Sequence, residues 1–289
     1  MYERGWKRYA ILALFLGPSL VGTMIFSLGP IFAALGLSFT NWDMLTPAEF
    51  VGLANFRRMF GDAEFWATLR HTITFLVGYV PLVLVAGLAV AVLMNRQLPA
   101  RSIFRAMYFL PVVTSWVAVA LVWKWLFNPT FGLVNTLLGF IGISGPSWLF
   151  DPNWAMPAVI LTSVWKDTGF VMIILLAALQ GIPREYEEAA SIDGATAFQR
   201  LVHVKLPLLS PAIFFALSIS LINSFQVFDQ VYVMTQGGPA GATTVLVERI
   251  VANAFSYSRM GHASAMSMVL FVMIFCTTFL FYRLRRWQV

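Results

Sequence analysis

Long apolar segments recur along this chain and constrain its fold more than any other feature. A bilayer core about 30 Å thick needs about 20 apolar residues of helix. Hydrophobic residues make up 59% of the chain and charged residues 11%. A transmembrane β-barrel is excluded, because its strands are much shorter and less uniformly apolar. Since each backbone amide needs a partner inside the bilayer, the sequence predicts an all-α polytopic membrane protein. Its six transmembrane helices are expected near residues 9–39, 72–94, 106–126, 155–179, 212–234 and 263–282.

The distribution of basic residues orients these helices. Lys and Arg gather in cytoplasmic loops of membrane proteins. One set of loops carries twelve: Arg4, Lys7, Arg8, Arg96, Arg101, Arg105, Arg184, Arg200, Lys205, Arg283, Arg285 and Arg286. The opposite set carries five: Arg57, Arg58, Arg70, Arg249 and Arg259. We therefore expect a multi-pass protein of the cell (inner) membrane with both termini in the cytoplasm. This bias explains most of the net charge of +6, so no nucleic-acid partner is needed to account for it.

Other class signals are weak. The first apolar segment is too long for a signal peptide, and no small-residue cleavage site follows it closely, so we expect an uncleaved span. The chain has one cysteine, Cys276, which excludes a disulfide or a cysteine-based metal site within it. The three histidines are far apart in the sequence, and no metal site or catalytic group is expected.

A polar segment, residues 185–211, lies between the fourth and fifth apolar segments. Gly181 favours a left-handed cap on the fourth span, and Pro183 suits the first turn of a new helix. Asp193-Gly194 indicates a turn, and a second short helix is predicted from Ala195. A solvated connecting loop is the alternative. Small residues, a turn and two later prolines in one ordered pattern favour a helix–turn–helix along the membrane surface, within a loop spanning 181–211.

The polar segment also carries a spaced pattern. The pattern starts with Glu188-Ala189-Ala190 and, after three residues, continues with Gly194. After nine more residues it ends with Val204-Lys205-Leu206-Pro207. This resembles the signature of permease subunits of binding-protein-dependent ABC importers. Residues 50–56 (FVGLANF), 179–183 (LQGIP) and 235–239 (TQGGP) are similar to motifs of the carbohydrate (oligosaccharide/maltose-type) branch. The resemblance runs from the first span to the last.

The resemblance implies a role for the polar segment as a coupling helix that sits in a cleft of a cytoplasmic ABC ATPase. Closure of the ATPase dimer would draw the docked helices together and turn the transmembrane cavity from inward- to outward-facing. The contact residues it implies are Tyr186, Glu188, Ala189, Ala190, Asp193 and Gly194.

The resemblance also implies a set of partners. An external solute-binding protein would deliver a sugar, and a second permease would complete the pathway, either as a homodimer or, more usually in this branch, as a heterodimer with a homologue. The chain has no G-x-x-x-x-G-K-[ST] pattern, so ATP and Mg are expected on the ATPase subunits and no cofactor on this chain.

Two ionisable residues, Lys166 and Asp167, lie near the middle of the fourth apolar segment. Charges at this depth are costly and mark functional sites. Adjacent residues point about 100° apart on a helix, so the two are not a facing pair. At least one should face a wet cavity or a partner helix. The alternative is a structural pair that joins helices.

The fifth segment carries a run of polar residues. Asn223, Gln226 and Gln230 follow i, i+3, i+7, which predicts a polar stripe along one side. Dense donors and acceptors beside an aromatic platform, such as Phe170 or Trp165, suit a hydroxyl-rich sugar. Interhelical hydrogen bonding is the alternative. The predicted substrate-pathway residues are Lys166, Asp167, Phe170, Ser220, Asn223, Ser224, Gln226 and Asp229.

Two other classes compete with the importer interpretation. An ion-coupled secondary transporter would use Lys166, Asp167 and Asp229 as a relay. Transporters of that class often contain repeated halves, and the pattern of residues 185–211 occurs once. A membrane enzyme is the third class, but no nucleophile–base constellation supports it.

Overall fold

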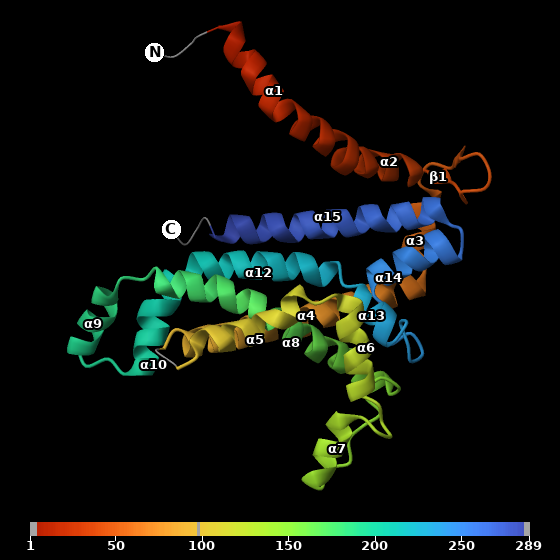
Figure 1. The fold of residues 1–289 in the computed structure, drawn as a ribbon. Coiled ribbons are helices and arrows are strands. Elements are labelled where there is room, and N and C mark those ends of the chain that lie inside the picture. Colours follow the sequence, from red (N-terminus) through yellow and green to blue (C-terminus); the bar gives the residue numbers. More distant parts are fainter. Residues whose placement is uncertain (1–4, 97–98, 286–289) are drawn as a thin grey trace. The chain divides into compact units, whose positions relative to one another are not determined.

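The computed structural model describes residues 5–96 and 99–285, and nearly all of its elements are helices (Figure 1). The chain packs as two compact units. Unit 1 takes in residues 1–63 and 249–272, and unit 2 takes in residues 64–248 and 273–289. This architecture confirms the predicted all-α fold. The assignment of residues 1–289 to one transmembrane permease domain stays a prediction.

Unit 1 begins with an apolar helical segment and a short β-hairpin. Its elements are α1 (Trp6–Thr23), the π-helical turn η1 (Met24–Leu28), α2 (Gly29–Leu37), β1 (Thr40–Asn41), β2 (Glu49–Phe50), α3 (Ala54–Phe60), the π-helical turn η3 (Ala252–Ser256) and the first half of α15 (Met260–Arg285). The strands are antiparallel, with Thr40 opposite Phe50. Buried Asn55 donates to the carbonyls of Ser38 (3.0 Å) and Thr40 (2.8 Å). The FVGLANF motif therefore holds the hairpin against α3.

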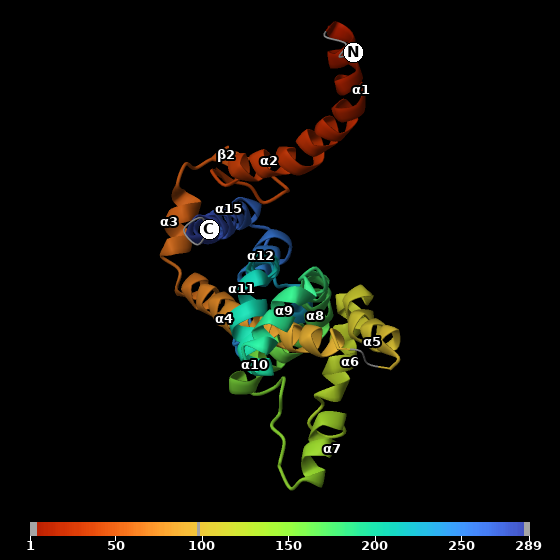
Figure 2. The same ribbon diagram turned by 90° about the vertical axis from the view of Figure 1, so that its left-hand side faces the viewer.

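Unit 2 contains most of the helices. They are α4 (Ala63–Met94), α5 (Arg101–Val113), α6 (Trp116–Leu126), α7 (Leu133–Phe140), α8 (Pro152–Gln180), α9 (Arg184–Ile192), α10 (Ala197–Arg200), the π-helical turn η2 (Leu201–Lys205), α11 (Leu206–Leu208), α12 (Ser210–Phe225) and α13 (Asp229–Met234), with α14 (Leu246–Val251) at the boundary between the units. Figures 1 and 2 show α4, α5 and α12 in one bundle around α8.

The bundle packs closely around α8. A side chain at Gly87 of α4 would overlap Val171 of α8. One at Gly169 of α8 would overlap the Tyr108 carbonyl of α5. These glycines let the helix backbones approach closely, which is how helices associate in membranes. Val83, Val159, Met172 and Leu175 are among the fully buried residues of this core.

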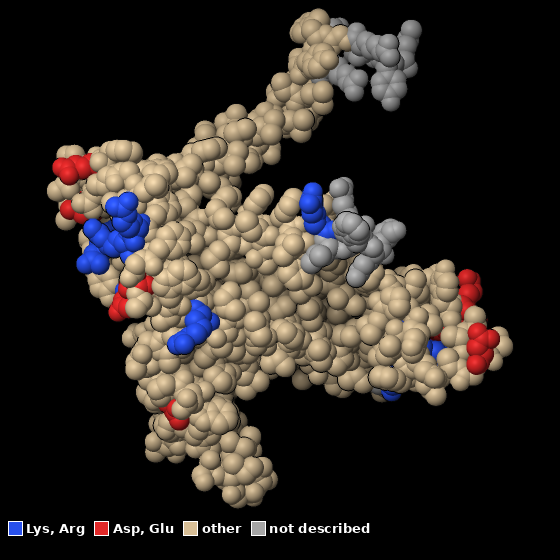
Figure 3. Space-filling model, turned by 180° about the vertical axis from the view of Figure 1, so that it is seen from behind, with Lys and Arg blue, Asp and Glu red and all other residues tan. Residues whose placement is uncertain are grey.

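Within the described residues, four helical segments are long and apolar enough to cross a membrane: Tyr9–Leu37, Ala63–Met94, Pro152–Gln180 and Met260–Arg283. Two bent pairs raise the number to six if each pair is one span. On the face seen in Figure 3, charged side chains form a few separate patches, and most of the surface is uncharged. A largely uncharged surface suits a multi-pass membrane protein.

The third and fifth predicted spans are broken helices. α5 and α6 meet at 101° across Thr114-Ser115. The second bent pair joins Ala197–Leu208 to α12 at 71°. The fifth span, predicted near 212–234, consists of two helices, because α12 ends at Phe225 and α13 begins only at Asp229.

Candidate functional site

The polar segment begins where α8 ends. Gly181 caps α8 with φ −81°, and its N–H donates to the Ala177 and Ala178 carbonyls. The predicted left-handed cap at Gly181 is therefore wrong, because the chain leaves α8 through a right-handed turn. Pro183 lies one residue before α9 and is extended, with ψ 138°. Glu185 and Glu187 occupy the first turn of α9, where the positive end of the helix dipole favours carboxylates.

The end of α9 confirms the predicted Asp193-Gly194 turn. Gly194 has φ +80°, a left-handed conformation that glycine adopts without strain. Its N–H donates to Ser191 O at 3.1 Å, and the Ala195 N–H donates to Ala190 O at 2.9 Å. These two bonds form a Schellman motif, which satisfies the last carbonyls of the helix. The glycine of the spaced pattern is thus the residue that turns the chain back.

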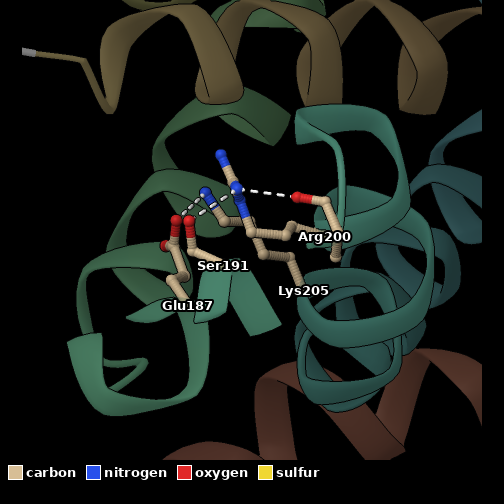
Figure 4. Close-up of polar contacts among 5 residues, drawn as sticks. Glu187, Ser191, Arg200 and Lys205 are labelled. Carbon is tan, nitrogen blue, oxygen red and sulfur yellow. Dashed lines mark hydrogen bonds and ion pairs between the residues drawn. The ribbon is translucent and has the colours of Figure 1, made fainter. Parts of the chain in front are cut away.

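A second short helix follows the turn, as predicted, but begins at Ala197 and not at Ala195. Thr196 and Gln199 form a reciprocal capping box at its start. Arg200 donates to Ser191 Oγ (3.3 Å) and to the Ala195 carbonyl (2.8 Å). Lys205 forms an ion pair with Glu187 at 2.9 Å (Figure 4). The helical hairpin, defined here as residues 184–205, is therefore held together by its own side chains.

The hairpin carries three exposed apolar side chains. Tyr186 is 53% exposed, Ile192 86% and Phe198 73%. Ala189 is also exposed and Ala190 half-buried. Tyr186, Ala189 and Asp193 share one side of α9 by helical spacing. Three of the predicted contact residues therefore lie on one side of α9, and the contact of all six with an ATPase stays a prediction.

A second feature is a cavity of about 220 Å³ inside unit 2. Its lining combines aromatic rings with amide and carboxyl groups: Phe75, Tyr79, Trp116, Asp167, Asn223, Gln226, Val227, Phe228, Asp229 and Gln230. The predicted helical stripe is wrong, because the chain is not helical between α12 and α13. The same polar residues nevertheless meet in the cavity, because the break turns them toward α4 and α8.

Lys166 and Asp167 face different surroundings, as their spacing predicts. Asp167 lines the cavity, where Tyr79 Oη donates to its carboxylate at 2.8 Å. Lys166 is buried and donates to the Pro111 (3.0 Å) and Val112 (3.1 Å) carbonyls. Carbonyls at a helix end lack partners within the helix and attract a cation. Lys166 therefore stabilises the broken end of α5 and does not line the cavity.

The remaining predicted pathway residues lie outside the cavity lining. Ser224 is buried and bonds to the Leu221 carbonyl at 2.7 Å. Ser220 is buried and Phe170 half-buried. Sequence reasoning missed the aromatic residues that do line the cavity: Phe75, Tyr79, Trp116 and Phe228. A tyrosine inside an apolar segment was the available signal for Tyr79, since a buried hydroxyl needs a partner.

Two uninterrupted helices connect the hairpin to the cavity. α8 carries Asp167 thirteen residues before its last residue, Gln180. α12 carries Asn223 thirteen residues after its first residue, Ser210. At 1.5 Å per residue, each path is about 20 Å long. The chain therefore links each end of the hairpin to the cavity through one long helix.

No group of three or more His, Cys, Asp and Glu side chains within residues 5–96 and 99–285 could hold a metal ion.

The chain matches the family model of binding-protein-dependent transport system inner membrane components over residues 83–288. This region includes the hairpin, α8, α12 and most of the cavity lining. The chain therefore belongs to the family of inner membrane components of binding-protein-dependent transport systems, and it is a membrane-spanning permease.

Named relatives cover nearly the whole chain. The lactose transport system permease protein LacF of Rhizobium radiobacter is 38% identical over 94% of this chain and 93% of its own length. The trehalose/maltose transport system permease protein MalF of Thermococcus litoralis is 34% identical over 95% of this chain and 93% of its own. A chain of a bacterial alginate ABC transporter, solved in complex with an alginate-bound periplasmic protein, shares the fold with a TM-score of 0.85 at 24% identity, over 97% of this chain and 95% of that one.

Proposed function

We propose that this chain is the transmembrane permease subunit of an ATP-driven ABC importer for a di- or oligosaccharide or a related polar solute. The observation that carries the proposal is its full-length similarity to permeases of lactose and trehalose/maltose transport systems. The comparisons give no support to an ion-coupled transporter that uses Lys166, Asp167 and Asp229.

The chemistry of the cavity supports a sugar as substrate. A sugar presents hydroxyl groups around its edge and apolar C–H groups on its faces. Asn223, Gln226 and Gln230 offer amide donors and acceptors, and Asp167 and Asp229 offer carboxylates. The aromatic rings provide flat apolar surfaces. A second permease subunit would supply the facing wall of the pathway.

The hairpin is the proposed docking element for the ATPase. Its preformed turn and its exposed apolar side chains, Tyr186 and Ile192, suit insertion into a cleft of a soluble partner. Glu188, Ala189, Ala190, Asp193 and Gly194 are proposed to lie at or beside this contact. ATP and Mg would bind the partner ATPase dimer, since the chain lacks a phosphate-binding loop sequence. This chain itself would be neither an enzyme nor a cofactor carrier.

Alternating access follows from this arrangement. Closure of the ATPase dimer would move the hairpin, and α8 and α12 would carry the displacement to Asp167 and Asn223. Such coupling requires contacts that differ between two states. We further propose that both termini and the hairpin are cytoplasmic, on the basis of the basic-residue bias, and that an external solute-binding protein delivers the substrate.

Uptake into proteoliposomes tests the proposal. The full chain would be reconstituted with its second permease and ATPase subunits, and radiolabelled sugar would be presented with the binding protein outside. Uptake that requires enclosed ATP and all components supports the assignment. Uptake by the chain alone, driven by an ion gradient, refutes it.

A further inference from the structure

A second cavity, of about 940 Å³, lies where the helical hairpin meets the ends of α4, α5 and α8. Two acidic residues, Glu187 and Glu188, line it. Six basic residues line it as well: Arg96, Arg101, Arg105, Arg184, Arg200 and Lys205. The lining thus carries an excess of four positive charges. We name this feature the basic cavity.

Two of the six basic side chains already have partners within the hairpin. Lys205 pairs with Glu187, and Arg200 donates to Ser191 and to the Ala195 carbonyl. Within the described residues, no ion pair is found for Arg96, Arg101, Arg105 or Arg184. The positive charge of these four arginines is therefore available to another partner.

Two of these arginines converge on one neutral group. Arg101 and Arg105 lie one turn apart on α5. Both donate to the side-chain oxygen of Gln180, the last residue of α8, when that amide is turned so that its oxygen faces them. An amide oxygen balances neither charge. The Nε atoms of both arginines are buried and lack a hydrogen-bond partner within the described residues. Such buried donors are rare in folded proteins and call for an acceptor.

The position and geometry of the basic cavity indicate which acceptor fits. Arg96 follows α4, Arg101 begins α5 and Gln180 ends α8, so the cavity lies at one common end of three apolar helices. Phospholipid phosphates lie where the ends of transmembrane helices meet the membrane surface. Guanidinium forks match the oxygens of a phosphate in a bidentate way. Basic pockets between transmembrane helices on the cytoplasmic side bind anionic headgroups.

The exposed apolar side chains of the hairpin overlap the basic cavity only in part. Phe198 lines the cavity, and so does Glu188, one of the proposed ATPase contacts. Tyr186 and Ile192 do not line it. A phosphate in the basic cavity would therefore lie beside the proposed ATPase contact.

We propose that the basic cavity binds a phosphate group, supplied either by an anionic phospholipid headgroup or by a soluble phosphate, with Arg101 and Arg105 as its principal ligands. Arg96 and Arg184 complete the positive surroundings. A phosphate held there connects α5 and α8 to the hairpin, and it balances the positive charge of the two guanidinium groups. The proposal rests on the membrane placement of the helices and not on the identity of the transported solute.

Native mass spectrometry of the purified full chain tests this proposal. The chain in neutral detergent would be titrated with phosphatidylglycerol or, as a comparison, with phosphatidylcholine of the same acyl chains. The variant R101Q/R105Q removes two cavity cations. The matched control R57Q/R58Q removes an adjacent exposed pair from α3. Each basic residue near an anionic membrane surface increases the affinity about fivefold. Loss of two such residues in R101Q/R105Q should therefore weaken phosphatidylglycerol binding about 25-fold. The affinity of R57Q/R58Q should be unchanged.

Two further variants separate ligand binding from a structural role. R101K/R105K keeps both charges, and we expect it to retain most of the binding even if the glutamine variant folds poorly. Gln180→Ala removes the neutral acceptor, and we expect binding that is unchanged or tighter. Loss of binding in Gln180→Ala, with the arginines intact, would show that they only hold helix ends together and would overturn the proposal.

A competition arm distinguishes the two sources of phosphate. Displacement of phosphatidylglycerol from the wild type by inorganic phosphate identifies a site for the phosphate group itself. Arginine-dependent lipid binding that inorganic phosphate leaves unchanged identifies the lipid headgroup. Equal phosphatidylglycerol binding by the wild type and R101Q/R105Q overturns the proposal. The ATPase subunit could instead protect these arginines from chemical modification while neither phosphatidylglycerol nor inorganic phosphate binds. That result would assign the cavity to the ATPase contact and would also overturn the proposal. None of these measurements depends on transport.

Discussion

The turn at Gly194 allows a quantitative test of the coupling segment. Gly194 has φ +80°, and a Cβ placed on it would meet nothing within 4 Å. The cost of Gly194→Ala is therefore backbone strain alone, about 1–2 kcal/mol for an L-residue in a left-handed conformation. If the turn relaxes to escape that strain, it loses the hydrogen bonds from Gly194 to Ser191 and from Ala195 to Ala190. A cost of this size lowers the equilibrium ratio of intact to disrupted hairpin about 5- to 30-fold.

Gly181 provides the matched control at the other end of the same segment. It has φ −81°, and a Cβ there would make an ordinary contact of 3.4 Å with the Ala178 carbonyl. Gly181→Ala should be neutral or stabilising by up to about 1 kcal/mol. Gly194→Asn should recover part of the loss, because asparagine tolerates the left-handed region.

Two measurements follow from this pair of glycines. Thermal unfolding in detergent should show a lower melting temperature for Gly194→Ala and no loss for Gly181→Ala. ATP-driven uptake by the reconstituted transporter should fall in the order Gly181→Ala, Gly194→Asn, Gly194→Ala, with membrane insertion unchanged. Equal uptake in Gly194→Ala and Gly181→Ala would refute the claim that the left-handed turn is required for coupling.

Three further predictions concern the cavity, the broken helix and α14. Tyr79→Phe removes the donor to the α8 carboxylate and should destabilise the protein by about 1–3 kcal/mol and raise the KM for uptake. Tyr257→Phe, at an exposed tyrosine, is the control variant. An equally large loss of stability in Tyr257→Phe would contradict the prediction. Lys166→Met leaves two α5 carbonyls without their cation and should lower stability by about 2–3 kcal/mol, as read by chemical unfolding, whereas exposed Lys124→Met should change it by less than about 0.5 kcal/mol. Burial raises the pKa of the Glu248 carboxyl above its ordinary value of 4.5. The stability that this protonated carboxyl contributes is therefore fully present below pH 4.5, and it is lost as the pH rises through the raised pKa. Melting temperature should therefore rise on acidification toward pH 5, and Glu248→Gln should flatten this dependence. An identical slope in the variant would exclude Glu248 as its source.

Composition predicted the membrane class and the location of the polar segment, because both depend on local sequence. The turn at Gly194 could be predicted for the same reason, since a left-handed residue strongly favours glycine. Gly181 looked equivalent, but its neighbours allow a right-handed exit. A glycine permits the left-handed conformation and does not require it.

The broken helices could not be predicted from hydropathy. Apolar residues lie on both sides of Thr114-Ser115 and of residues 226–228, and hydropathy reports the composition of a segment without the direction of its backbone. The break after α5 is stabilised by Lys166, more than fifty residues further along the chain. Lys166 was predicted to be part of the pathway because it is ionisable, whereas its partners are backbone carbonyls that a side-chain pattern does not reveal.

The cavity residues show a second limit of prediction from local sequence. Asn223, Gln226 and Asp229 were predicted to be pathway residues from a helical spacing that the structure does not contain. They still line the cavity because polar groups in this region gather away from lipid. Tyr79 joins them through a tertiary contact with Asp167, which no local pattern indicates.

Site-specific photo-cross-linking of the hairpin tests the docking assignment most directly. The sole cysteine, Cys276, would be replaced by serine, and one cysteine carrying a benzophenone would be placed at Ile192 of α9 or at Phe140 of α7. These side chains are similarly exposed, at 86% and 82%, so accessibility is matched. In the assembled transporter, the probe at position 192 should cross-link to the ATPase subunit and the probe at position 140 should not. Absence of an ATPase adduct at 192, or equal adducts at both positions, would contradict the assignment of α9 as the coupling helix.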